Sequence, residues 1–229
     1  FYGEKAAFVS GWLYWLNWAV TAVADATAIA IYVNWFGRYN QFFYDLPQWL
    51  TAFIVVIITV SFNLISVKIF GELEFWFALI KILALLTFMA VGIWYLFFGQ
   101  PIDGVQPGLP LIATSDGLFP HDALTTLIVV QGVVFAYAGI ELVGTTSGET
   151  KDVQKVIPRA INAVVWRIAI FYVGSITLLC LLMPYTVYSD TESPFVIFFD
   201  KIGVAGTAPI MQLVVITAAA SSLNAGLYS

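Results

Sequence analysis

Three ionisable residues stand inside long apolar stretches of the sequence: Asp25, Lys81 and Glu141. A charged side chain at membrane depth costs about 2.5–3.5 kcal/mol on insertion scales, so it normally faces a partner or a water-filled cavity. The chemistry open to such groups is ion pairing, substrate binding and the gain or loss of a proton. They are therefore the first candidate functional residues.

Lys81 lies about nine residues into its apolar stretch, which is about 13 Å of helix at 1.5 Å per residue. This depth is close to the middle of a bilayer. The functional interpretation is an amine that gains and loses a proton during coupling. The alternative is a side chain that extends to the inner surface, which is a long reach from this depth.

Glu141 ends the segment QGVVFAYAGIE, in which small residues alternate with aromatic ones. A helix that unwinds there would line a cavity and free backbone carbonyls to hold an ammonium group. The alternative is an ordinary close crossing of two helices, which small residues also allow. Asp25, in AVADATAIA, is open to three roles: substrate contact, pairing with another buried group, or exposure to a wet crevice.

The composition indicates a membrane protein. Hydrophobic residues make up 61% of the sequence and charged residues only 10%, too few to cover a soluble domain of this size. The lipid bilayer is thus the expected partner, and the net charge of −5 argues against nucleic acid, which requires a basic surface. Nothing in the sequence indicates an oligomeric state.

A spanning helix needs about 20 mainly apolar residues, and six stretches come near this. The sequence therefore predicts an all-α integral membrane protein, with the chain 1–229 forming part of a transmembrane domain. The predicted spans cover residues 6–35, 50–67, 73–98, 123–144, 164–183 and 209–229, and a cytoplasmic loop helix is predicted over 150–163.

The basic residues of the loops predict the orientation. If all six stretches span, one side collects six basic residues and the other collects two, Arg38 and Lys201. The richer side should be cytoplasmic, so the first span runs from inside to outside. No signal peptide is recognisable, and because both ends fall in or beside apolar segments, we expect the chain to be part of a longer protein.

Four strings of the sequence are similar to those of a known family: GWLYWLNWAVTAVADATA, GELEFWFALIKILALL, VVFAYAGIELVGTTSGETKDVQKVIPRAIN and SSLNAGLYS. Through them the chain resembles the bacterial amino-acid permeases of the amino acid–polyamine–organocation (APC) superfamily over essentially its whole length. Within that superfamily, QGVVFAYAGIELVGT and SPFVIFFDKIGV are most similar to the branch that carries L-asparagine.

This resemblance implies a fold of twelve helices, ten of them in two inverted five-helix repeats of the leucine-transporter type. The chain would supply the third to the eighth helix. The first helix, whose glycine-rich break binds the substrate carboxylate in the family, would lie outside the chain, so the carboxylate-binding residues have no counterpart here.

The resemblance also implies the roles of individual residues. The broken sixth helix would correspond to 135–141, with the carbonyls of Phe135 and Ala138 accepting the substrate ammonium and the Phe135 ring acting as a gate. Lys81 would stand where sodium-dependent relatives hold a sodium ion, beside Ser221 and Ser222. The complete set comprises Asn17, Trp18, Thr21, Asp25, Phe135, Ala136 and Ala138 for substrate binding, and Lys81, Glu141, Ser221 and Ser222 for proton coupling and gating.

The function implied is secondary active import of an L-amino acid, with asparagine favoured, by proton symport and alternating access in the bacterial cytoplasmic (inner) membrane. No catalytic residues, metal or cofactor are expected beyond the proton as coupling ion. One alternative is an amino-acid exchanger or facilitator without proton coupling. A membrane-embedded enzyme that uses Asp25 or Glu141 as a base is a further alternative.

Overall fold

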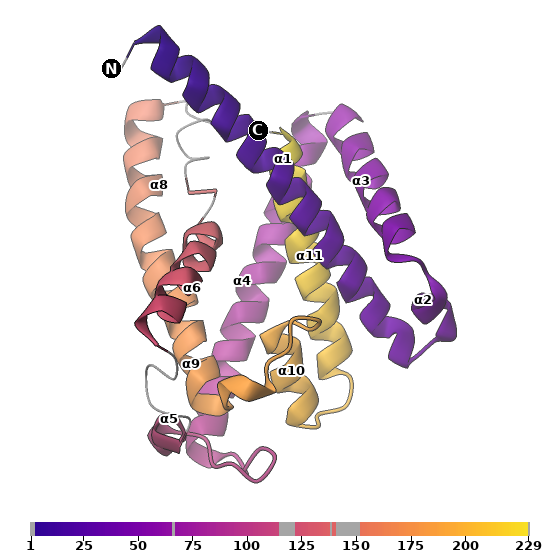
Figure 1. The fold of residues 1–229 in the computed structure, drawn as a ribbon, viewed down its shortest axis with the longest axis vertical. Helices are drawn as coiled ribbons and strands as arrows, with labels where there is room; N and C mark the ends of the chain where they lie inside the picture. The colour runs from indigo at the N-terminus through magenta and orange to yellow at the C-terminus, as the bar shows by residue number, and fades with distance from the viewer. Residues whose placement is uncertain (1–2, 66, 115–121, 138, 141–151, 229) are drawn as a thin grey trace. The chain divides into compact units, whose positions relative to one another are not determined.

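A computed structural model of the chain describes residues 3–65, 67–114, 122–137, 139–140 and 152–228. The regular structure of these residues is helical (Figure 1), apart from one isolated bridge between Ile102 and Val105. The prediction of an all-α fold is therefore confirmed. The chain divides into two compact units, residues 1–84 with 189–229 and residues 85–188.

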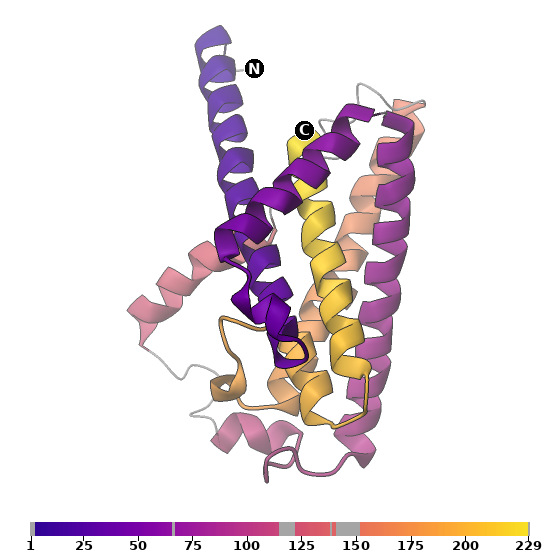
Figure 2. The same cartoon turned by 90° about the vertical axis from the view of Figure 1, so that its right-hand side faces the viewer.

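The first unit is built around three helices that pack on one another, α1, α3 and α11 (Figures 1 and 2). Its elements are α1 (Glu4–Asn34), η1 (Trp35–Arg38), α2 (Gln41–Asp45), α3 (Gln48–Ile65), the part of α4 (Val67–Phe98) up to residue 84, α10 (Pro194–Lys201) and α11 (Thr207–Tyr228).

Local sequence signals set several of these helix ends. The side chain of Asn40 caps α2 by accepting a hydrogen bond of 2.9 Å from the backbone N–H of Phe42, as capping residues do. Pro194 stands at the start of α10, where its fixed φ suits the first turn and its missing N–H costs nothing.

Small and branched apolar residues let α1, α3 and α11 approach closely. Ala26, Ile29 and Leu223 form the buried centre, and the half-buried residues around them are Ala22, Val33, Ala52, Val55, Val56, Ile216, Ala219 and Ala220. At one point the approach requires a glycine, because a Cβ on Gly226 would lie 2.6 Å from Cε3 of Trp18. Close contact through small residues is how helices associate in lipid.

The second unit contains the rest of α4 and the following helices up to residue 188. Its further elements are α5 (Leu109–Thr114), α6 (Ala123–Ala136), α8 (Val153–Arg167), η3 (Ile168–Val173), α9 (Gly174–Leu182) and η4 (Tyr185–Val187).

The helices α8, η3 and α9 follow one another without interruption from Val153 to Leu182, and the middle segment is a π-helix. The loop helix expected over 150–163 and the span expected over 164–183 are thus parts of one continuous helix in the described residues. Pro158 lies inside α8 without ending it. The composition of this helix changes from polar to apolar along its length. This change reflects different surroundings of its two halves, while the helix itself continues.

Four helices of the described residues are long and apolar enough to cross a membrane: residues 4–38, 71–98, 153–182 and 207–228. Two shorter apolar helices, residues 48–64 and 123–133, overlap the other two predicted spans. At most 28% of each long helix's most apolar window is buried inside the protein. The remaining apolar surface is what a spanning helix presents to lipid.

Candidate functional site

A cluster of polar side chains joins α4 to α11 in the first unit. The Nζ of Lys81 donates a hydrogen bond of 2.7 Å to the Oγ of Ser221, and the Ser221 hydroxyl donates one of 2.6 Å to Oε2 of Glu74. The Nδ2 of Asn224 donates a third, of 2.8 Å, to Oε1 of the same carboxylate. We call Lys81, Glu74, Ser221 and Asn224 the α4–α11 cluster.

Helix α3 joins the α4–α11 cluster through Asn63. Its Nδ2 donates to Oδ1 of Asn224 at 2.9 Å and to the backbone carbonyl of Thr59 at 3.1 Å. The Oδ1 of Asn63 is buried and has no hydrogen-bond partner in the structure. Polar side chains therefore connect the three helices α3, α4 and α11. Helices α3 and α11 also share an apolar contact surface.

Helical periodicity brings these residues together. Glu74 and Lys81 are seven positions apart on α4, so they lie on the same face, about 10 Å apart along the axis. Ser221 and Asn224 are three positions apart on α11 and also share a face. Since Lys81 meets the earlier of these two residues and Glu74 the later, α4 and α11 run antiparallel at this contact.

The α4–α11 cluster is largely withdrawn from solvent on the α11 side. Ser221 is 2% exposed and Asn224 is 4% exposed, whereas Lys81 and Glu74 are half-buried. In a low dielectric each polar group must find a partner or bear the cost of desolvation. The bonds above supply those partners.

Asp25 on α1 is the second acidic residue near Lys81. Its carboxylate accepts a hydrogen bond from the Ser222 hydroxyl, and its charge interacts with that of Lys81. The Oδ2 of Asp25 is buried without a hydrogen-bond partner. The charge of Lys81 thus interacts with those of two carboxylates, Glu74 on its own helix and Asp25 on α1.

The structure brings Lys81, Ser221, Ser222 and Asp25 together, four of the residues assigned by the resemblance. Their roles in coupling stay predictions. Glu74 is not among the residues predicted from the sequence, although its spacing of seven residues from Lys81 was a visible signal.

Asn63 and Asn224 were also not identified from the sequence. Each is a lone amide in an otherwise apolar helix, and a polar side chain in such a helix commonly forms a bond to a neighbouring helix. The signal was therefore present, but it does not name the partner.

The other residues predicted on the first span differ in their exposure. Trp18 is 8% exposed and packs on Gly226, with its Nε1 buried and without a partner. Thr21 is buried, and its hydroxyl bonds the carbonyl of Asn17 at 2.8 Å. Asn17 itself is exposed. Asn17 and Thr21 are four positions apart and Trp18 and Thr21 are three apart, so helical periodicity makes these residues neighbours on α1, and their role in substrate binding stays a prediction.

The predicted break in the helix after residue 135 has a described counterpart. Helix α6 ends at Ala136, immediately after Phe135, and Gly139 has a φ of 95°, a conformation that glycine adopts without strain. The helix therefore stops inside the span predicted from the sequence, within the segment where the break was expected. Ala138 and Glu141 lie outside the described residues, as does most of the motif that follows Glu141.

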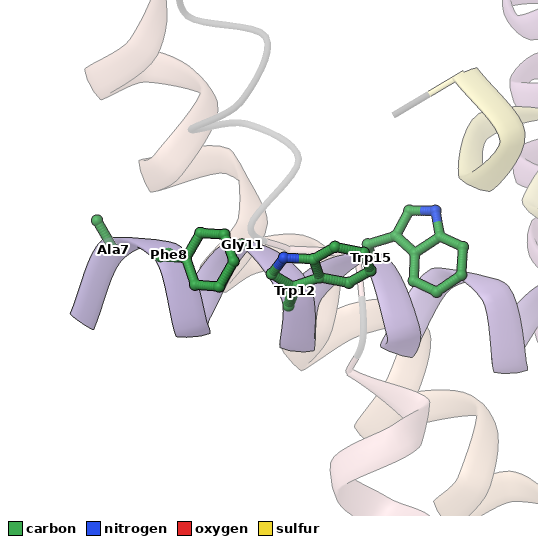
Figure 3. A pocket seen from close by; sticks show the side chains of 5 residues that line it. All are labelled: Ala7, Phe8, Gly11, Trp12 and Trp15. Atoms are coloured by element: carbon green, nitrogen blue, oxygen red, sulfur yellow. The ribbon is translucent and has the colours of Figure 1, made fainter. Parts of the chain in front are cut away.

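A hollow of about 490 Å³ lies on the N-terminal half of α1 (Figure 3). Its lining residues are Ala7, Phe8, Gly11, Trp12 and Trp15. All belong to one helix, and Phe8, Trp12 and Trp15 are exposed. None of them carries a charge that could bind a zwitterion, so this hollow is a gap between surface aromatic rings and not a candidate substrate site.

A second polar group lies at the other end of α1. The guanidinium of Arg38 forms an ion pair of 2.5 Å with Glu192 and one of 3.4 Å with Asp200, and it lies 4.1 Å above the Trp35 ring. These contacts connect η1 to α10 and to the segment before it. Under the predicted orientation, they lie on the outer side of the membrane.

The described fold is that of a polytopic helical membrane protein with an ionisable cluster inside it. The family model that matches the chain is "Amino acid permease", and the match covers residues 1–229. The chain therefore belongs to the amino acid permease family, and a transporter is the class of protein that this family indicates.

The relatives found among curated proteins carry a more specific name. The chain is 53% identical to the L-asparagine permease of Salmonella typhimurium over 228 residues, which are 100% of this chain and 45% of the relative. It is 56% identical to L-asparagine permease 1 of Mycobacterium tuberculosis, covering 46% of that protein, and 48% identical to the L-asparagine permease of Streptomyces coelicolor, also covering 46%. The chain thus spans slightly under half the length of these relatives. No solved structure matches it.

Proposed function

We propose that the protein imports an L-amino acid together with a proton by alternating access, with L-asparagine as the favoured substrate. Membership of the amino acid permease family supports an amino-acid substrate, and the names of the relatives support asparagine. The bacterial origin of these relatives supports a place in the bacterial cytoplasmic membrane.

The observation that carries proton coupling is the hydrogen-bonded connection of Lys81 to Glu74 through Ser221, with the charge of Asp25 also acting on Lys81. One ammonium and two carboxylates carry a net charge of −1 when all are ionised, and binding one proton makes the group neutral. Charge is costly in a low-dielectric interior, so the protonation state of this group would favour one arrangement of α1, α4 and α11 over another. The proton is the coupling ion of this proposal, and no other cofactor is part of it.

The C-terminal end of α6 supports a site for the ammonium group of the substrate. An amino acid is a zwitterion, so its ammonium group needs acceptors when it leaves water. The carbonyls at the C-terminal end of a helix are such acceptors and carry the negative end of the helix dipole. Because α6 ends at Ala136, the carbonyl of Phe135 belongs to the last turn of this helix, where the proposal places the substrate ammonium.

The contact between α4 and α11 supports the proposal that these two helices move relative to each other during transport. Within the first unit, the polar bonds of the α4–α11 cluster join these two helices. Such bonds can be exchanged for others, whereas the apolar contact among α1, α3 and α11 holds those helices together. An equilibrium between two arrangements that differ in these bonds is what ligand and proton would shift.

The test is uptake of labelled asparagine by the full-length protein in liposomes, with and without an imposed proton gradient. We expect accumulation only with the gradient and its loss when an ionophore dissipates the gradient. Uptake that ignores the gradient would favour an exchanger or facilitator. Competition by unlabelled amino acids in the same assay measures selectivity, and chemical change of the substrate would indicate an enzyme.

A further inference from the structure

Lys81 and Glu74 are the ends of an unbroken hydrogen-bonded chain with one hydroxyl in the middle. The Lys81 amine donates to Ser221 at 2.7 Å, and Ser221 donates to Glu74 at 2.6 Å. Both separations are typical of charge-assisted hydrogen bonds. A hydroxyl can accept a proton on one side while it releases its own on the other, so this geometry is that of a proton relay.

We propose that Glu74 is the internal proton acceptor of Lys81 and that the Ser221 hydroxyl carries the proton between them. This inference rests on the proposed proton symport and names the path of its proton. In the step, the ammonium of Lys81 gives one proton to Oγ of Ser221 while the hydroxyl proton of Ser221 moves to Oε2 of Glu74. The products are a neutral amine, a re-formed hydroxyl and a neutral carboxylic acid, so atoms and electrons balance.

After the transfer, both hydrogen bonds of the chain reverse their direction. The Ser221 hydroxyl then donates to the Lys81 amine, and the protonated Oε2 of Glu74 donates to Ser221. Asn224 still donates to Oε1 of Glu74, which remains an acceptor, and Asn63 holds Asn224 in place. No atom of the chain loses its partner, so the transfer needs no rearrangement of the helices.

The hydrogen-bonded chain from Lys81 to Glu74 also has a direction across the membrane. Glu74 lies two turns before Lys81 on α4, about 10 Å closer to the N-terminal end of that helix. Under the predicted orientation this end faces the cytoplasm, so the proton moves from the middle of the bilayer toward the inner side. Because Glu74 is half-buried, it can release the proton to water, whereas Ser221 at 2% exposure cannot.

Within the part of the protein that the structure describes, few other titratable groups lie near the hydrogen-bonded chain formed by Lys81, Ser221 and Glu74. Asp25 approaches Lys81 from α1, but its hydrogen bond is to Ser222, so it is not joined to the Ser221 hydroxyl by the bonds given above. Helix α3 carries no ionisable side chain in its sequence and α11 carries only Tyr228. Asp25 thus acts on Lys81 through its charge, while Glu74 is connected to it by hydrogen bonds.

The test compares Glu74→Gln, which keeps the size and an acceptor oxygen of the side chain but cannot be protonated, with the full-length wild-type protein in liposomes. We expect Glu74→Gln to lose substrate-driven proton entry, followed with an entrapped pH dye, and to lose accumulation, while it still exchanges labelled for unlabelled asparagine. Ser221→Ala should likewise lose proton entry and accumulation while it keeps exchange. Glu74→Asp should restore part of the proton entry, and Glu72→Gln, an exposed residue two positions earlier on α4, should behave as wild type.

Normal proton entry per asparagine in Glu74→Gln would overturn the relay while leaving the proposed symport intact. If the wild type moves asparagine without protons, the symport itself fails, and the relay fails with it. Infrared difference spectra give an independent measurement that also applies when a variant transports poorly. A protonated-carboxyl band that appears in the wild type on acidification, and is absent from Glu74→Gln, supports the relay, and its presence in both proteins contradicts it.

Discussion

The side-chain amides of Asn63 and Asn224 bond each other across 2.9 Å, and only the second of them also reaches the Glu74 carboxylate. Asn224 is therefore the residue through which α3 contributes to the α4–α11 cluster. Removing it breaks two bonds between helices, whereas removing Asn63 breaks one. This difference makes the two amides a matched pair for measuring the cluster's contribution to stability.

We predict that Asn224→Ala lowers the free energy of unfolding more than Asn63→Ala does. Asn224→Ala leaves Oε1 of Glu74 and Nδ2 of Asn63 short of a partner, and such a loss typically costs about 1 kcal/mol or more for each group. Thermal unfolding of the purified full-length protein in detergent measures the effect. Asn162→Ala, at an exposed position of α8, is the control. Equal effects of all three substitutions would contradict the prediction.

We predict that Lys81→Ala abolishes concentrative uptake while the protein stays folded in detergent. The substitution leaves Asp25 and Glu74 without the ammonium between them, so one proton can no longer neutralise the group. Gradient-driven uptake and size-exclusion chromatography test the two parts of this prediction. Lys155→Ala, on the exposed surface of α8, should transport normally, and accumulation by Lys81→Ala would remove Lys81 from the coupling mechanism.

Gly226→Ala should destabilise the packing of α1 on α11. Its Cβ would lie 2.6 Å from Cε3 of Trp18, and forcing extra atoms into a packed contact typically costs about 1–3 kcal/mol. Gly11→Ala is the control, because nothing lies within 4 Å of a Cβ at that position. Combining Gly226→Ala with the smaller Trp18→Leu should recover part of the loss, and no recovery would place the strain elsewhere.

The burial of Tyr188 leads us to predict that the stability of the protein decreases at alkaline pH. Burial of its phenol raises the pKa of Tyr188 above its ordinary value of 10.0, and the electrostatic effect of Cys180 adds to this. A pKa that is higher in the folded than in the unfolded protein means that the stabilisation is complete below pH 10 and is lost as the pH rises above it. Tyr188→Phe also removes the 2.7 Å bond to the carbonyl of Leu179, so it should lower stability at neutral pH and flatten the decline above pH 10. An unchanged decline in the variant would assign it to other groups.

We predict that Phe135→Ala raises the KM for asparagine more than it lowers expression. The resemblance to the family assigns the Phe135 ring to gating and its carbonyl to the substrate, and the substitution removes only the ring. Initial rates of uptake over a range of asparagine concentrations, normalised to the amount of protein in the liposomes, measure the effect. Phe97→Ala, at an exposed position near the end of α4, is the control. An unchanged KM would show that this ring does not border the substrate.

The pairing of Lys81 with Ser221 could be expected from the sequence only through the resemblance, because periodicity within one helix does not identify the helix opposite. Glu74 was not singled out because the predicted third span began at residue 73, which placed this carboxylate at a membrane surface. Helix α4 begins instead at Val67, so Glu74 lies in its third turn. The start of that helix was hidden by Lys68 and Glu72, since charges lower the mean hydropathy without ending a helix.

The helical class and the approximate span positions could be predicted because apolar stretches of about 20 residues have one common solution in lipid. The continuity of the helix from Val153 to Leu182 could not, because its first half is polar and its π-turn has no sequence signature of its own.

The 140 positions that separate Lys81 from Ser221 have a consequence for biogenesis. Helix α4 leaves the ribosome long before α11, so its ammonium group cannot enter lipid with its final partner. Asp25 on α1 is synthesised earlier still and can neutralise Lys81 during that interval. Membrane insertion of α4 should therefore depend on α1, and the late arrival of α11 would exchange a temporary ion pair for the finished network.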